Sequence, residues 1–118
     1  MQNEYLTVKS WRGLRQGSMG RYRIEYLPLA YEDLEDIFNY IAADNPVAAA
    51  DLLDKIDSSV LHLEEFPDIG VNPKNRRLLN KGYKILIIDD YLVFYVVVDD
   101  IVEIRRIISG KQNYTNLL

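Results

Sequence analysis

Three strand-length runs near the C-terminus constrain the fold of this chain most strongly. They are residues 83–88, 91–98 and 101–108, which are rich in β-branched and aromatic residues, and the pairs Asp89-Asp90 and Asp99-Asp100 separate them. Two-residue polar breaks between strands predict two successive β-hairpins. Aspartate adopts positive φ less readily than glycine, so the pattern leaves the strand registers open.

The middle run, residues 91–98, is apolar on both of its faces. We therefore expect it to be the central strand of the sheet, with helices covering one face. The other face also needs a cover, which can come from neighbours of the first strand and the C-terminal tail or from a partner.

Residues 22–63 change from a strand period to a helical period. Tyr22-Arg23-Ile24-Glu25-Tyr26 alternates apolar and charged residues before Pro28, as a strand with one buried face does. Apolar stripes at helical spacing follow on both sides of Asn45-Pro46, a pair suited to a helix N-cap and first turn. The order is thus β-α-α-β-β-β, an α+β fold with a helical hairpin packed on a mainly antiparallel sheet. One domain should span residues 21–118.

Residues 1–20 show neither period and contain three glycines. We interpret them as a poorly ordered N-terminal extension, or as a segment foreign to the native protein, with Met19 a candidate start.

Composition excludes several classes of protein. The 118 residues contain no cysteine, and His62 is the only histidine, so we expect no metal site, no disulfide framework and no cofactor. No apolar run is long enough to cross a membrane and no secretory signal is visible, which favours a cytoplasmic protein without a membrane partner. A net charge of −4 argues against a surface that coats nucleic acid, so any phosphate contact must be local.

Basic residues gather in the second half of the chain. The candidate target-binding patch consists of Lys74, Arg76, Arg77, Lys81, Lys84 and Arg105. The alternative is a solvated loop for the first five and a structural ion pair with Glu103 for Arg105. Strand alternation predicts that Arg105 and Arg106 point to opposite faces, so that at most one of them joins any single surface. Tyr83, Tyr91, Tyr95 and Tyr114 are candidates for stacking on a base or anchoring a partner, or for the core.

The ordered set of segments resembles the RelE/ParE superfamily of toxins over residues 21–118. The matching pieces are Tyr22-x-Ile24, an acidic helical hairpin, Gly82-Tyr83-Lys84-Ile85-Leu86, Tyr91-Leu92-Val93-Phe94-Tyr95 and Val102-Glu103-Ile104-Arg105-Arg106-Ile107-Ile108-Ser109-Gly110. The resemblance implies the fold above and a cognate antitoxin that wraps the toxin. It also implies one of two activities: RelE-like members cleave messenger RNA in the ribosomal A site, and ParE-like members inhibit DNA gyrase.

The RelE catalytic pattern is only partly present. Lys84 and Lys111 match basic residues of that pattern, but Leu86 and Leu92 stand where it has basic residues. Gln112 replaces a further arginine, and the terminal tyrosine can be supplied only out of register. An endoribonuclease would therefore have to use Lys84, Arg77, Lys111 and Tyr114. Cleavage through the 2′-hydroxyl needs cations and proton-transfer groups close to the phosphate. Their loss favours a ParE-like inhibitor that is not an enzyme.

The resemblance thus predicts the toxin of a type II toxin–antitoxin module, of the kind that stabilises plasmids. We expect it to inhibit growth by binding DNA gyrase, to be neutralised by a cognate antitoxin, and to reach operator DNA only through that antitoxin. The alternative is a ribosome-dependent endoribonuclease that blocks translation. A third possibility is a degenerate member that binds antitoxin and operator without toxicity.

Overall fold

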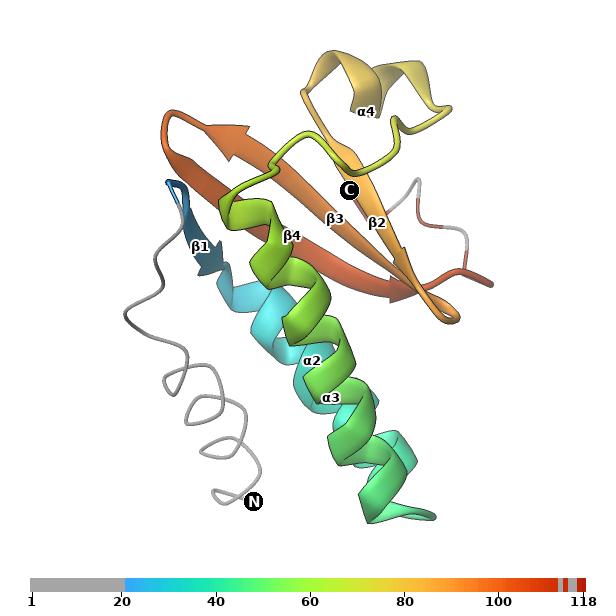
Figure 1. The fold of residues 1–118 in the computed structure, drawn as a ribbon. Helices are drawn as coiled ribbons and strands as arrows, with labels where there is room; N and C mark the ends of the chain where they lie inside the picture. Colours follow the sequence, from blue (N-terminus) through green and yellow to red (C-terminus); the bar gives the residue numbers. More distant parts are fainter. Residues whose placement is uncertain (1–20, 113, 115–116) are drawn as a thin grey trace.

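The structure, a computed structural model, describes residues 21–112, 114, 117 and 118. Its elements are β1 (Arg23–Tyr26), α2 (Pro28–Ala42), α3 (Pro46–Leu61), the 3-10 turn η1 (His62–Glu64), α4 (Arg76–Asn80), β2 (Lys84–Ile88), β3 (Tyr91–Val98) and β4 (Ile101–Ser109) (Figure 1). The predicted α+β order is confirmed, and α4 is a short addition before the strands. The interpretation of residues 1–20 falls outside the described residues.

The strands form one sheet in the order β1-β4-β3-β2. β1 runs parallel to β4, whereas β4, β3 and β2 are antiparallel to their neighbours, so the sheet is mainly antiparallel as predicted. Tyr91 pairs with Ile88 and Val98 with Ile101, which confirms the two hairpins with two-residue turns. The first aspartate of each turn has a positive φ, 53° at Asp89 and 56° at Asp99.

A β-bulge interrupts the pairing of β3 with β4. Phe94 pairs with Arg106 and Tyr95 with Ile104, which leaves Arg105 without an opposite residue. Because a bulge shifts the alternation of side chains by one residue, the prediction that Arg105 and Arg106 face opposite sides is wrong. Both arginines line one hollow of about 370 Å³.

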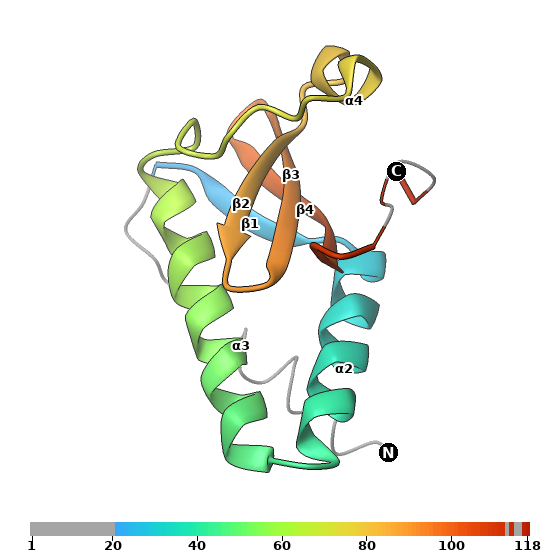
Figure 2. The same ribbon diagram turned by 90° about the vertical axis from the view of Figure 1, so that its right-hand side faces the viewer.

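Each face of the sheet carries its own buried cluster. The helix-side core lies under α2 and α3, an antiparallel hairpin seen side-on in Figure 2, and includes Leu34, Leu53, Ile56, Val93, Tyr95, Ile104 and Ile107. The tail-side core lies on the other face and consists of Leu78, Tyr83, Ile85, Phe94, Val96 and Ile108. Tyr114 and Leu118 pack against it. The tail and α4 thus provide the cover that the doubly apolar strand β3 requires.

Tyr95 fastens the loop that connects η1 to α4. Its ring is fully buried, and its hydroxyl donates to the carbonyl of Pro67 at 2.8 Å and accepts from the N–H of Gly70 at 2.9 Å. Burial raises the pKa of the Tyr95 phenol, and the Gly70 N–H opposes that rise only in part, so the hydroxyl keeps its proton as a donor.

None of the described helices is both long and apolar enough to cross a membrane.

Candidate interaction site

α4 presents most of the predicted basic patch. The side chain of Asn75 caps the helix by accepting from the N–H of Leu78 at 3.1 Å, and Leu78 is completely buried in the tail-side core. One buried leucine and one cap therefore orient this short helix, which projects past the end of the sheet (Figure 1). The outward side chains are all exposed: Lys74, Arg76, Arg77 and Lys81.

The described tail residues Tyr114 and Leu118 pack against the same face of the sheet as α4. The guanidinium of Arg77 donates to the main-chain oxygen of Leu118 at 3.3 Å. The ring of Tyr114 packs at a tilt against Phe94 with 4.9 Å between centroids, so this ring is a packing element of the tail-side core.

Lys84 lies on the opposite face of the sheet. It pairs with Tyr95 of the helix-side core, and cross-strand partners share a face. Its Nζ atom donates to Oδ1 of Asn72 at 3.1 Å. Although it is close in sequence to the α4 cations, Lys84 is therefore separated from Arg77 and Tyr114 by the sheet.

Lys111 lies at the other end of the sheet from α4. It is exposed and follows Gly110, whose N–H donates to the carbonyl of Asp90 in the β2–β3 turn at 2.7 Å. β2 begins at Lys84 and ends just before this turn, so roughly 13 Å of strand separates Lys84 from the turn beside Lys111. Of the four residues that an endoribonuclease would need, the structure brings only Arg77 and Tyr114 to one side.

Arg105 is engaged by its own strand. Its Nη2 and Nε atoms bind Oε1 of Glu103 at 2.7 and 3.2 Å, and its guanidinium lies 5.7 Å from the ring centroid of Tyr83. Burial alone lowers the pKa of Arg105, but the bonds to Glu103 and Tyr83 outweigh it and raise the pKa overall. The geometry is that of a structural ion pair, the alternative anticipated for this residue.

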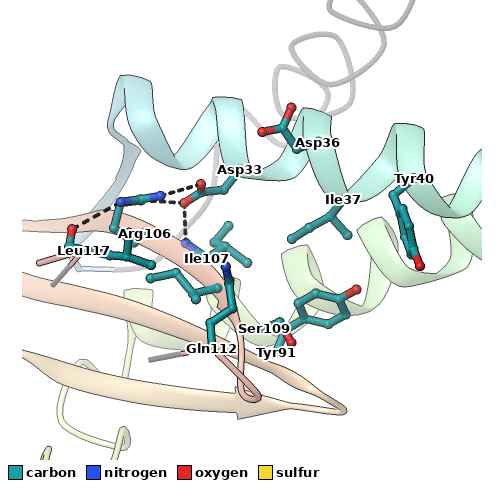
Figure 3. A pocket seen from close by; sticks show the side chains of 11 residues that line it. Asp33, Asp36, Ile37, Tyr40, Tyr91, Arg106, Ile107, Ser109, Gln112 and Leu117 are labelled. Atoms are coloured by element: carbon teal, nitrogen blue, oxygen red, sulfur yellow. Dashed lines mark hydrogen bonds and ion pairs between the residues drawn. The ribbon is translucent and has the colours of Figure 1, made fainter. Parts of the chain in front are cut away.

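A groove of about 590 Å³ separates α2 from the end of β4 (Figure 3). At one end of it Arg106 forms a two-point ion pair with Asp33, at 2.8 and 2.9 Å. Neither Asp33 nor Tyr40 was a candidate site residue from the sequence alone. No local period could mark this groove, because residues some seventy positions apart form it. The full lining is Asp33, Asp36, Ile37, Tyr40, Tyr91, Arg106, Ile107, Ile108, Ser109, Gln112 and Leu117.

No group of three or more His, Cys, Asp or Glu placed to hold a metal ion occurs within the part of the chain that the structure describes. His62 is exposed in η1.

Fold and surface together define a small α+β domain of the RelE/ParE type, with a basic helix at one end of its sheet and an open groove beside α2. The sequence matches the family described as "ParE toxin of type II toxin-antitoxin system, parDE" over residues 24–114. The chain belongs to this ParE toxin family.

The architecture is also similar to that of a solved chain described as "Chromosomal ParDE TA system from P. aeruginosa". The two share 18% sequence identity with a TM-score of 0.63, over 75% of this chain and 96% of that one. At this identity the likeness concerns the fold. A search among curated proteins finds no match.

Proposed function

We propose that this ParE-family toxin arrests growth by binding a macromolecular target through the exposed cations of α4. DNA gyrase is the target that the family resemblance suggests. We further propose that a cognate antitoxin neutralises it, and that the chain reaches operator DNA only in complex with that antitoxin.

The observation that carries the proposal is the concentration of exposed positive charge on and beside α4 in a chain of net charge −4. Arg76 and Arg77 lie on α4, which is only five residues long, and Lys74 and Lys81 flank it; all four side chains are exposed. Such a local patch favours electrostatic docking on an acidic surface of a protein or a protein–DNA complex.

The separation of Lys84 and Lys111 from Arg77 and Tyr114 supports binding rather than cleavage of RNA. General acid–base chemistry requires its groups within hydrogen-bond reach of one phosphate. The hydroxyl of Tyr114 also belongs to a ring that serves packing against Phe94. We therefore place the endoribonuclease second.

The test is induction of residues 19–118 without antitoxin, with growth, plasmid supercoiling and the 5′ ends of messenger RNA followed together. We expect growth arrest with loss of negative supercoiling and intact messages. Purified protein should inhibit DNA supercoiling by gyrase in the same way. Arrest with new codon-phased 5′ ends and normal supercoiling would instead identify an endoribonuclease.

Charge reversal assigns the docking surface. The double variant Arg76→Glu/Lys81→Glu should lose inhibition by at least tenfold, because it replaces two exposed cations of α4 with anions. The matched control is Arg21→Glu/Arg23→Glu, which makes the same change at two exposed arginines near β1 and should inhibit like the wild type. Equal loss in both variants would contradict a role specific to α4.

A further inference from the structure

The outer edge of β4 is covered by a strand along only half of its length. β1 ends at Tyr26, and its pairing with β4 extends from Ile101 to Ile104. Beyond that point the start of α2 lies beside β4: the N–H of Leu27 donates to the carbonyl of Ile104, and the carboxylate of Asp33 accepts from the N–H of Ile107 at 2.8 Å.

The main chain after Ile107 continues to face the groove. The N–H of Gly110 points toward β3, because it donates to Asp90. Main-chain groups of a strand alternate in direction, so the carbonyl of Ile107 and the N–H of Ser109 point the other way, toward α2. On this outer side, no described strand pairs with β4 beyond Ile104. It is a short open sheet edge, a template for strand addition.

The opposite wall of the groove is apolar with an acidic rim. Ile37 is half-buried, Tyr40 is 82% exposed, and Asp36 is exposed one turn before Tyr40 on α2 (Figure 3). The ring of Tyr91 closes the far end, where burial, followed by the charge of Asp90 and the nearby Tyr40, raises the pKa of its phenol. An exposed tyrosine beside a half-buried isoleucine is the kind of surface that anchors a protein partner.

The charges of the residues that line the groove indicate what kind of segment can bind there. Arg106 neutralises Asp33, whereas Asp36 has no ion pair or hydrogen bond to another described residue. Of the charged residues that line the groove, Asp36 is therefore the one without a described partner, and it makes the α2 side of the rim acidic. A complementary occupant carries a lysine or arginine next to an apolar side chain.

We propose that an extended, basic segment of the antitoxin occupies this groove and adds to the open edge of β4 in line with β1. Its main chain bonds to the Ile107 carbonyl and the Ser109 N–H. A lysine or arginine of the segment meets Asp36, and an apolar side chain lies between Ile37 and Tyr40. The inference rests on the proposed neutralisation by an antitoxin and adds where and by what chemistry that partner binds.

The test measures binding of a purified full-length antitoxin candidate, the product of the gene adjacent to that of the toxin if one is present there, to wild-type and variant toxin. Overlapping synthetic peptides that cover the antitoxin serve as the second probe. Asp36→Lys and Tyr40→Ala should each raise Kd at least tenfold. Their matched controls, Asp51→Lys on α3 and Phe66→Ala after η1, alter exposed residues outside the groove and should bind like the wild type.

The sheet edge is tested separately. Ser109→Pro removes the N–H that faces the groove and leaves the bonds of β4 to β3 in place. It should weaken the antitoxin complex more than Ser109→Ala, which removes only the hydroxyl. Circular dichroism and thermal unfolding confirm that each variant is folded before its binding is measured.

The possible results distinguish failure of the groove as the antitoxin site from failure of antitoxin neutralisation itself. Tight wild-type binding that weakens in the Asp36, Tyr40 and Ser109→Pro variants, with one basic peptide losing affinity in parallel, supports the inference. Tight binding that all groove variants retain overturns it and leaves the antitoxin partnership intact. Absence of any complex with wild-type toxin refutes neutralisation itself. A toxin dimer that Tyr40→Ala dissociates, with antitoxin affinity unchanged, assigns the groove to a second copy and also overturns the inference.

Discussion

Arg106 and Asp33 form a two-point ion pair in which Nε lies 2.8 Å from Oδ2 and Nη2 lies 2.9 Å from Oδ1. Their side chains are only 19% and 12% exposed. The same carboxylate accepts the N–H of Ile107 at 2.8 Å, and Arg106 also donates to the carbonyl of Leu117 at 3.2 Å. Hydrogen bonding to Asp33, ahead of the opposing effect of burial, raises the pKa of Arg106. The pair therefore joins α2, the bulged strand β4 and the tail.

Removal of Asp33 should destabilise the fold in two measurable steps. Asp33→Asn removes the charge but keeps an oxygen for the Ile107 N–H, whereas Asp33→Ala also leaves that N–H without a partner. We expect losses of unfolding free energy of about 1–2 and about 3 kcal/mol. Denaturant titration at neutral pH measures both, with Asp51→Asn and Asp51→Ala as exposed controls. Equal effects of the two Asp33 variants would contradict a role for the bond to Ile107.

The stability of the fold should fall both when the Tyr95 hydroxyl is removed and when a Cβ is added at Gly70. Tyr95→Phe leaves the Pro67 carbonyl and the Gly70 N–H without their buried partner, which should cost about 2 kcal/mol. Gly70→Ala would place a Cβ 2.5 Å from the Tyr95 hydroxyl and 2.8 Å from its ring, so it should cost at least as much. Thermal unfolding tests both, and Tyr40→Phe, which deletes the hydroxyl of an 82% exposed ring, should leave Tm unchanged.

The β3–β4 turn should respond oppositely to glycine at its two positions. Asp99 has a φ of 56°, where an L side chain is strained, so Asp99→Gly should leave stability unchanged or raise it by up to about 1 kcal/mol. Asp100 is not among the residues with positive φ, so Asp100→Gly only adds freedom to the unfolded chain and should lower stability by about 0.5–1 kcal/mol. The difference in Tm between the two variants is the readout. A higher Tm for Asp100→Gly would count against the turn geometry.

Two substitutions of Tyr114 test whether its ring serves packing or its hydroxyl serves catalysis. Its ring packs against Phe94, so Tyr114→Ala should expose part of the tail-side core and lower the unfolding free energy by about 1–3 kcal/mol. Tyr114→Phe keeps the ring and should match the wild type in both stability and growth arrest. If Tyr114→Phe is folded but has lost growth arrest, the hydroxyl has a chemical role and the endoribonuclease becomes the better reading.

Much of the fold could be read from local patterns in the chain. The two Asp-Asp breaks located both hairpins, the alternation at Tyr22–Tyr26 located β1, and Asn45-Pro46 marked the start of α3, where the Asn45 side chain accepts from the N–H of Ala48. Strand and helix periods, turn residues and caps are properties of neighbours in sequence, so they need no knowledge of distant contacts.

The candidate site was less predictable because it depends on which face of the sheet each side chain lies on. A cluster of basic residues in sequence suggested one patch, but the alternation of β2 placed Lys84 on the face opposite the tail. The bulge at Arg105 turned two arginines expected on opposite faces toward one hollow. A bulge carries no clear sequence signature, and a shift of one residue reverses every later side chain.

By itself, then, the sequence determined the order of elements, the family and the local concentration of charge, because each is encoded within short stretches of chain. Only the tertiary structure decided that Asp33 meets Arg106, that Tyr95 holds the Gly70 loop and that the outer edge of β4 after Ile107 stays open beside Tyr40. Those relationships depend on how β1, α2 and β4 pack against one another. Because that packing is a balance of many weak contacts between residues far apart in the chain, no single segment specifies it.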